Sequence, residues 1–331
     1  MSKLRDYTTL ASHIIDRIPL VRDMKIPEIP KHEPRIILSP VTGKITQLNA
    51  SKSLLKQLIY KGNPLPMCPY KALHVYLLRD IPDVTSEAMR RGLYFETMCL
   101  GASARGEGTY DLKRHSRTGE KLSDHVRIDN AVDRFHYVVK ELGMVVGMGN
   151  DPPLIQVYNS IPWEDPIRKW DIDIMLEGTA DFFTPIKTET RDIPVVNVDL
   201  KLTADRDRCF PPFCWGCPEE LDFMEAMMYR KIFGVGFMYL VFDYKANNPW
   251  YKDIPVITDI NDEDPSKSVK AQHRMNDLDQ SIRWTAGTIQ MWEAQGWPKD
   301  PESQVVFGKP TTPCKDCPIL DCEVRNITEE V

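Results

Sequence analysis

Apolar residues recur every three or four positions in several stretches of the chain, which is the spacing of one face of an α-helix. The clearest case follows a candidate cap at Thr85 or Ser86, where Met89, Leu93 and Leu100 share a face. Similar patterns predict helices over 54–58, 71–80, about 129–146, 219–233 and about 267–295, the first of them capped by Ser51 or Ser53.

Other stretches are rich in β-branched and aromatic residues and predict strands. Residues 174–186 and 195–202 form two such runs, and the polar segment between them predicts a hairpin connection. Residues 236–244 are apolar nearly throughout, as in a buried strand. The Pro-rich first 50 residues predict extended segments and turns, whereas 105–128, 205–218 and 245–265 predict loops. The order of elements predicts an α/β fold with a small mixed central sheet flanked by helices.

Composition narrows the class of protein. The 331 residues are 42% hydrophobic and 27% charged, as in an ordinary globular chain of one large domain or two. No apolar stretch approaches the roughly 18 residues that span a bilayer, and the N-terminus lacks the pattern of a signal peptide. We therefore expect a cytoplasmic protein without a membrane partner.

The net charge of −6 gives no support to a general affinity for nucleic acid. A DNA-binding surface would need locally grouped basic residues. One stretch of the sequence contains such a group of basic residues. The alternative to a DNA-binding surface is that these residues only form a solvated loop and helix face. Its members are Arg105, Lys113, Arg114, His115, Arg117, Lys121, His125 and Arg127.

Asp199 and Lys201 lie two residues apart on a predicted strand, so their side chains point to the same face. If the two strands pair, Asp181 of the preceding strand lies near Asp199. Carboxylates in this arrangement suit Mg²⁺ or Mn²⁺, which can activate water, and a neighbouring lysine can stabilise developing negative charge. A surface hairpin with an ion pair is the alternative. The apolar residues around Asp199 favour the metal site, because a buried charge needs a partner.

Two predicted helices carry further carboxylates on apolar faces. Glu96 shares the face of Leu93 and Leu100, where a carboxylate is costly unless it is paired or binds metal. It could instead reach solvent at the boundary of the helix. Glu225 and Tyr229 lie four residues apart on the later helix. They could face the site and hold a phosphate or the lysine, or they could lie on a half-buried edge of the helix.

Six of the eight cysteines lie in two tight clusters, which favours metal binding in a chain without an export signal. Cys314, Cys317 and Cys322 supply three ligands, so a fourth must come from elsewhere; free thiols are the alternative. Cys209, Cys214 and Cys217 are either a separate Zn²⁺ site or reduced thiols. Cys99 sits on a helix and is expected in the core.

Taken in their order along the chain, the carboxylate and lysine motifs resemble those of the RecB-like branch of the PD-(D/E)XK nuclease superfamily. The resemblance covers roughly residues 50–325. The branch carries Gly-x-x-x-Glu (Glu96), an Asp after a small-residue turn (Asp181), and (D/E)-x-K (Asp199 and Lys201). Its Gln-x-x-x-Tyr helix reads Glu225-x-x-x-Tyr229 here, and Ala180 replaces the proline. The resemblance implies a restriction-endonuclease-like core in which Glu96, Asp181 and Asp199 bind Mg²⁺ or Mn²⁺ for cutting DNA.

The cysteine layout is similar to that of iron–sulfur nucleases of the AddB and CRISPR-adaptation types. The resemblance implies that Cys68, with Cys314, Cys317 and Cys322, holds a 4Fe–4S cluster, with Zn²⁺ as the alternative. It divides the chain into an extension (1–48), the nuclease domain (49–325) and a tail (326–331). It favours an exonuclease, like those that phages encode, acting on single strands or duplex ends alone or beside a helicase or recombination partner. The competing hypothesis is a non-catalytic scaffold that binds nucleic acid or a partner and is stabilised by a cysteine-bound metal.

Overall fold

The protein is described from a computed structural model of the chain. The structure describes residues 33–60, 63–64, 68–82, 86–101, 112, 114, 116–146, 154–190, 192–204, 224–245, 252–255 and 265–298. These residues belong to two compact units. The first unit lies within Thr85–Asn159 and Thr179–Ala271, and the second within Pro30–Val84, Ser160–Gly178 and Gln272–Val331.

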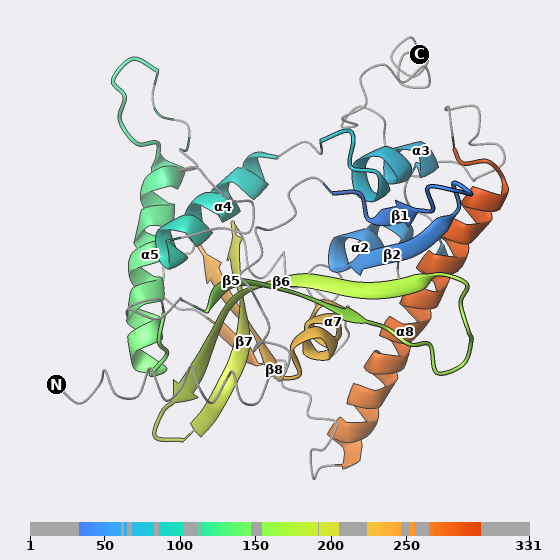
Figure 1. Cartoon of the computed structure of the whole chain (residues 1–331). Coiled ribbons are helices and arrows are strands. Elements are labelled where there is room, and N and C mark those ends of the chain that lie inside the picture. Colours follow the sequence, from blue (N-terminus) through green and yellow to red (C-terminus); the bar gives the residue numbers. More distant parts are fainter. Residues whose placement is uncertain are drawn as a thin grey trace. The chain divides into compact units, whose positions relative to one another are not determined.

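The fold is mixed α/β, with a seven-stranded mixed sheet flanked by helices, as the order of sequence patterns predicts (Figure 1). The sheet runs β1-β2-β6-β7-β8-β9, and β5 pairs with β6. Its strands are β1 (Ile36–Leu38), β2 (Ile45–Ser51), β5 (Ile155–Pro162), β6 (Asp173–Lys187), β7 (Asp192–Thr203), β8 (Gly236–Asp243) and β9 (Lys252–Pro255). A separate pair joins β3 (Ile59–Tyr60) to β4 (Asn63–Pro64).

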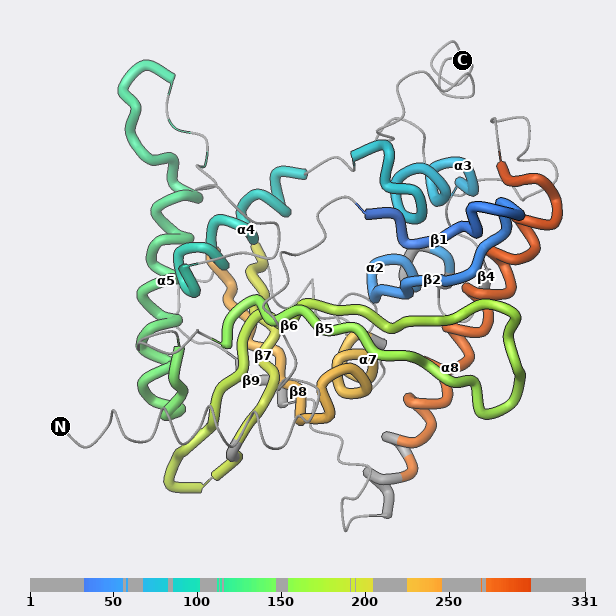
Figure 2. The backbone as a smooth tube through the Cα atoms, in the orientation of Figure 1, coloured from blue at the N-terminus to red at the C-terminus, as the bar shows by residue number. Residues whose placement is uncertain are grey.

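The predicted hairpin is present in the first unit, where β6 and β7 pair antiparallel with Phe182 opposite Val198. Figure 2 follows the backbone from β6 into β7. β7 then pairs in parallel with β8, and Asp199 lies opposite Tyr239. β8 is buried along most of its length, which explains its nearly continuous apolar sequence.

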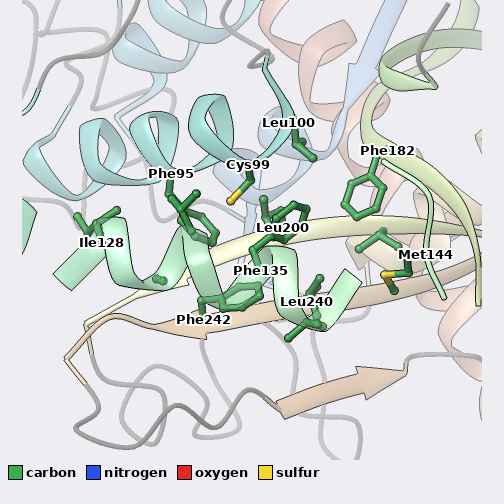
Figure 3. Close-up of a cluster of buried hydrophobic side chains, with 14 of the residues drawn as sticks. Phe95, Cys99, Leu100, Ile128, Phe135, Met144, Phe182, Leu200, Leu240 and Phe242 are labelled. Atoms are coloured by element: carbon green, nitrogen blue, oxygen red, sulfur yellow. The ribbon is translucent and has the colours of Figure 1, made fainter. Parts of the chain in front are cut away.

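One face of these strands carries the main hydrophobic core of the first unit. Two helices pack against it, α4 (Glu87–Leu100) and α5 (Ser123–Glu141). Figure 3 shows Phe95 of α4 and Phe135 of α5 beside Phe242 of β8, with ring centroids 5.3 and 6.1 Å from that of Phe242. Alternate residues of β7, among them Val198 and Leu200, join this cluster. The intervening residues of β7 therefore face the other side of the sheet.

The two helices differ in how well sequence patterns locate their starts. Ser86 caps α4 as expected, since its Oγ accepts from the amide of Met89 at 3.2 Å. α5 begins at Ser123, about six residues before the predicted start, and the prediction of a loop there was wrong. His125 and Ile128 are both buried in its first turns. The segment looks polar in sequence, but its buried residues stabilise the first turns of the helix through tertiary packing. Periodicity alone does not reveal this buried face.

The opposite face of the strands is covered by the short helix α7 (Met224–Phe233). Its contacts are aromatic: Phe233 lies 5.1 Å from Phe183 of β6, and Tyr229 stacks on Phe237 of β8 at 5.7 Å between centroids. α7 thereby fixes its polar residues against the face that carries Asp199 and Lys201.

The second unit contains β1, β2, the first part of β6 and three helical segments. Its helices are α2 (Lys52–Leu58), α3 (Pro69–Lys71), which continues as a π-helical segment (Ala72–Leu77), and the larger part of α8 (Pro265–Ala294). Ser51 caps α2, and α8 buries Leu278, Ile282 and Trp292, as their spacing predicts. In the described part of the chain, no helix combines the length and apolar character that crossing a bilayer requires.

Candidate active site

The two aspartates of the hairpin lie together where the pairing of β6 and β7 ends. Phe182 pairs with Val198, Asp181 and Asp199 are the next residue on each strand, and the charge of Asp199 acts on Asp181. Here the side chain of Asp181, rather than its backbone, bonds to β7: its Oδ2 accepts from the backbone amide of Leu200 at 2.6 Å. The carboxylate of Asp181 is thus fixed beside the strand that carries Asp199.

Lys201 lies two residues beyond Asp199 on the same face of β7, as predicted, and is ion-paired with Asp199. Its Nζ also lies 3.5 Å from Oε1 of Glu225 on α7. Burial alone would lower the pKa of Lys201. The charges of Asp199, Asp181 and Glu96 outweigh that effect and raise the pKa above its usual range. Lys201 therefore stays a cation at neutral pH.

Glu225 faces the site and is not the half-buried edge of the alternative interpretation. Its residue is 1% exposed, and the hydroxyl of Tyr239 donates to its Oε2 at 3.0 Å. With Lys201 at the other oxygen, both ends of the carboxylate have a partner. Glu225 thus places a buried carboxylate next to the lysine.

Tyr229 belongs to the same face of α7 but does not hold the lysine. Its hydroxyl donates to the carbonyl oxygen of Thr179 at 2.9 Å, two residues before Asp181. Burial, together with the charges of Asp199, Asp181 and Glu96, raises the pKa of Tyr229 well above its usual range. The side chain remains a neutral donor that fixes the segment leading to Asp181.

Glu96 reaches the same group from α4. Its charge acts on Asp181, Lys201 and Tyr229, which places its carboxylate within electrostatic range of all three. Its Oε1 accepts from Nε2 of Gln156 at 2.5 Å. Gln156 was not anticipated from the sequence, because a single glutamine outside any motif carries no recognisable signal.

The group carries more negative than positive charge. Among the described residues, the carboxylates of Glu96, Asp181, Asp199 and Glu225 lie within electrostatic or ion-pair range of Lys201. The pKa of Asp181 is raised well above its usual range, first by burial and then by the charges of Asp199 and Glu96. Lys201 and the amide of Leu200 act in the opposite direction and do not compensate. Another cation would relieve this repulsion.

The donor set matches part of what a divalent cation requires. Carboxylate oxygens in surplus are the ligands that Mg²⁺ and Mn²⁺ prefer, so the chemistry fits. Among the described residues, however, no three His, Cys, Asp or Glu side chains form a ready-made ligand set. Protein donors already engage Asp181, Asp199 and Glu96, through Leu200, Lys201 and Gln156. These contacts involve one oxygen of each carboxylate, so a bound cation would share the three carboxylates with the protein donors.

The described cysteines are Cys68 and Cys99. Cys68 lies in the second unit and immediately precedes α3. Cys99 is buried in the core, as expected, and burial followed by the charge of Glu96 raises the pKa of its thiol. The remaining six lie outside the described residues: Cys209, Cys214, Cys217, Cys314, Cys317 and Cys322.

Several members of the basic stretch are engaged within the protein. Lys121 lies 2.5 Å from Asp129, and Arg127 lies 3.7 Å from Asp124. His125 is buried, with Nε2 3.0 Å from the hydroxyl of Tyr94. Lys121 and Arg127 thus pair with carboxylates on the solvated side of the segment, whereas His125 belongs to the buried side of α5. Arg105, Lys113 and His115 lie outside the described residues.

Comparison with known proteins adds little to this geometry. Neither protein-family models nor curated proteins give a match to the sequence. Among solved structures, one described as the crystal structure of SSO0001 aligns over 60% of this chain and 71% of its own. The identity is 11% and the TM-score 0.27, values that support no conclusion about fold or function.

Proposed function

We propose that the chain is a metal-dependent DNA nuclease whose active site comprises Asp181, Asp199, Lys201 and Glu96. The observation that carries the proposal is the convergence of four carboxylates on one lysine, with the pKa of Asp181 raised by burial and by its neighbours. Such a concentration of buried negative charge is costly unless it serves to hold a cation. The sequence resemblance described above points to the same chemistry.

Glu96, Asp181 and Asp199 would hold the Mg²⁺ or Mn²⁺ ion. When bound, the ion supplies an activated water and offsets the charge of the scissile phosphate. In the metal-free protein the charges of Asp199, Asp181 and Glu96 raise the pKa of Lys201, which favours a cation over a general base at this position. Lys201 instead stabilises negative charge on the phosphate oxygens. Glu225 and Tyr239 orient Lys201, and Tyr229 orients the segment before Asp181.

The substrate class and setting follow the resemblance. We expect hydrolysis of phosphodiester bonds at single strands or duplex ends, in the cytoplasm, by an exonuclease. Cys68, Cys314, Cys317 and Cys322 would hold a 4Fe–4S cluster, with Zn²⁺ as the alternative that four thiolates also suit. Anaerobically purified protein should then absorb near about 400 nm, as thiolate-bound iron–sulfur clusters do. Cys68→Ser should lose that absorbance together with bound iron.

Linear and circular DNA incubated with Mn²⁺ or with EDTA test the nuclease directly. Wild-type protein should degrade linear DNA only when Mn²⁺ is present, and Lys201→Ala should abolish the loss. Lys187→Ala is the matched control, since Lys187 is an exposed lysine at the far end of the same hairpin. Loss of DNA that EDTA does not stop would contradict the proposal.

The scaffold hypothesis is favoured by one observation, the engagement of each expected metal ligand by a protein donor. It predicts that the protein binds DNA equally with and without divalent cations and leaves it intact. Gel-shift measurements on wild type and Lys201→Ala, with intact DNA recovered from both, would establish the scaffold.

A further inference from the structure

Gln156 of β5 has an unusual backbone conformation. Its φ is +53°, in the left-handed region that residues with a Cβ seldom adopt. A residue with a Cβ is strained in this conformation, and glycine would avoid most of the strain. The strained backbone directs attention to the contacts of the Gln156 side chain.

The side chain of Gln156 carries a second cost. Its residue is 9% exposed, and Oε1 is buried without a hydrogen-bond partner among the residues that the structure describes. An unsatisfied buried acceptor is unfavourable because it has lost its hydrogen bonds to water. The other end of the amide is engaged, because Nε2 donates to Oε1 of Glu96 at 2.5 Å.

Glu96 needs such a donor. The charge of Glu96 acts on Asp181 and raises the pKa of that carboxyl, so the two carboxylates oppose each other's ionisation. A hydrogen bond to a charged acceptor is stronger than one between neutral groups. The bond from Gln156 therefore offsets part of this repulsion and favours an orientation of Glu96 near the other carboxylates.

We propose that Gln156 is a positioning residue that holds the Glu96 carboxylate near Asp181 and Asp199. We further propose that Oε1 of Gln156 accepts a hydrogen bond from a water of a hydrated cation when the cation binds. The proposal rests on the function proposed above, since it names a further residue of the same site. Groups that orient metal ligands from behind change metal affinity about 10–100-fold when they are removed.

The test compares wild type with Gln156→Asn, with Mn²⁺ alone as the probe. Asparagine tolerates the left-handed backbone and keeps the amide, but it is one methylene too short to reach Glu96. Calorimetric titration should show Mn²⁺ binding weakened at least about tenfold, with the unfolding temperature of the metal-free protein little changed. Gln47→Asn, in β2 of the second unit, is the matched control and should bind Mn²⁺ as wild type does. A lower unfolding temperature with unchanged Mn²⁺ affinity would overturn the proposal, since it would mark a purely structural glutamine.

A second measurement needs neither metal nor activity. In the NMR spectrum of the metal-free protein, a side-chain amide proton of Gln156 should be shifted downfield by its charged acceptor, and Glu96→Ala should remove that shift. If Glu96→Ala leaves the chemical shift of the Gln156 amide proton unchanged, the proposal is overturned. This test remains available if Gln156→Asn fails to fold. Wild-type protein that binds no Mn²⁺ would contradict the proposed function instead, and the NMR result would still decide the pairing of Gln156 with Glu96.

Discussion

Lys201 is held as a cation by its neighbours. Burial would lower its pKa, but the charges of Asp199, Asp181 and Glu96 outweigh that effect and raise it. In the proposed active site the side chain would therefore supply a fixed positive charge. Its task is electrostatic, and the geometry around it, with Asp199 on one side and Glu225 on the other, fixes where that charge is placed.

This role predicts how substitutions at Lys201 behave. Lys201→Ala should lower kcat about 10²–10³-fold, the usual cost of removing one preorganised stabilising group. The pH dependence of wild-type cleavage should show no alkaline limb from a lysine near neutrality, because the pKa of Lys201 is raised. An alkaline limb near neutrality that Lys201→Arg displaces would contradict an electrostatic role and indicate a general base.

Asp181 gives a prediction about stability. The pKa of this carboxyl is raised in the folded state, so folding favours its protonated form. No cost arises below the pKa of the unfolded chain, where both states are protonated, and a cost develops as pH rises toward the folded pKa. Asp181→Asn should therefore raise the Tm at pH 7 while abolishing cleavage, and the gain should shrink toward pH 4. Each kcal/mol changes Tm by about 2–4 °C in domains of 150–250 residues, which thermal melts across pH resolve. A variant less stable than wild type at pH 7 would contradict this account.

At the scale of elements, sequence patterns predict the framework of the site and miss what holds it in place. The β6–β7 hairpin, β8, α4 and the position of Glu96, Asp199 and Lys201 on them follow from periodicities of two and 3.6 residues. Gln156 could not be predicted, because its significance lies in a φ value and a contact 60 residues away in the chain. Only tertiary packing brings such residues together.

The first turns of α5 show the same limit. Tyr94 of α4 donates to Asp129 at 2.7 Å, and Lys121 pairs with the other oxygen of that carboxylate. His125 joins the group through the hydroxyl of Tyr94. Local propensity does not encode these contacts, which attach the start of α5 to α4 and extend the helix beyond its predicted boundary.

Asp129 makes this attachment sensitive to acid. Burial would raise the pKa of its carboxyl, but the hydrogen bonds from Lys121 and Tyr94 outweigh that effect and lower the pKa. Its contribution is therefore complete above the pKa of the unfolded chain and is lost as pH falls through the folded pKa. Asp129→Asn should destabilise the protein at pH 7 by less than about 1 kcal/mol, since the group is partly exposed. The difference from wild type should vanish toward pH 2–3, and hydrogen exchange at residues 123–128 should report it. A difference that persists in acid would show that Asp129 acts through packing and not through its charge.

At the scale of the whole molecule, the proposed metal site and the proposed cysteine site belong to different units. Glu96, Asp181, Asp199 and Lys201 all lie in the first unit, whereas Cys68 lies in the second. An experiment can therefore contradict the proposed metal site without contradicting the proposed cysteine site, and the reverse. A protein without iron could still cut DNA, and a protein with a cluster could be inert.

This separation yields a prediction for unfolding in Mn²⁺. A ligand that binds only the folded state raises stability by RT ln(1 + [L]/Kd), which is about 2.7 kcal/mol at one hundred times Kd. The Tm of wild type should therefore rise with the logarithm of Mn²⁺ concentration, and where the units melt separately only the transition of the first unit should move. Asp181→Asn should show a much smaller rise, because it removes one ligand and the repulsion that the ion relieves. Asp129→Asn, which leaves all the expected ligands in place, should retain the full rise. Equal rises in wild type and Asp181→Asn would mean that Mn²⁺ binds elsewhere, and the carboxylates around Lys201 would then be a structural ion-pair network.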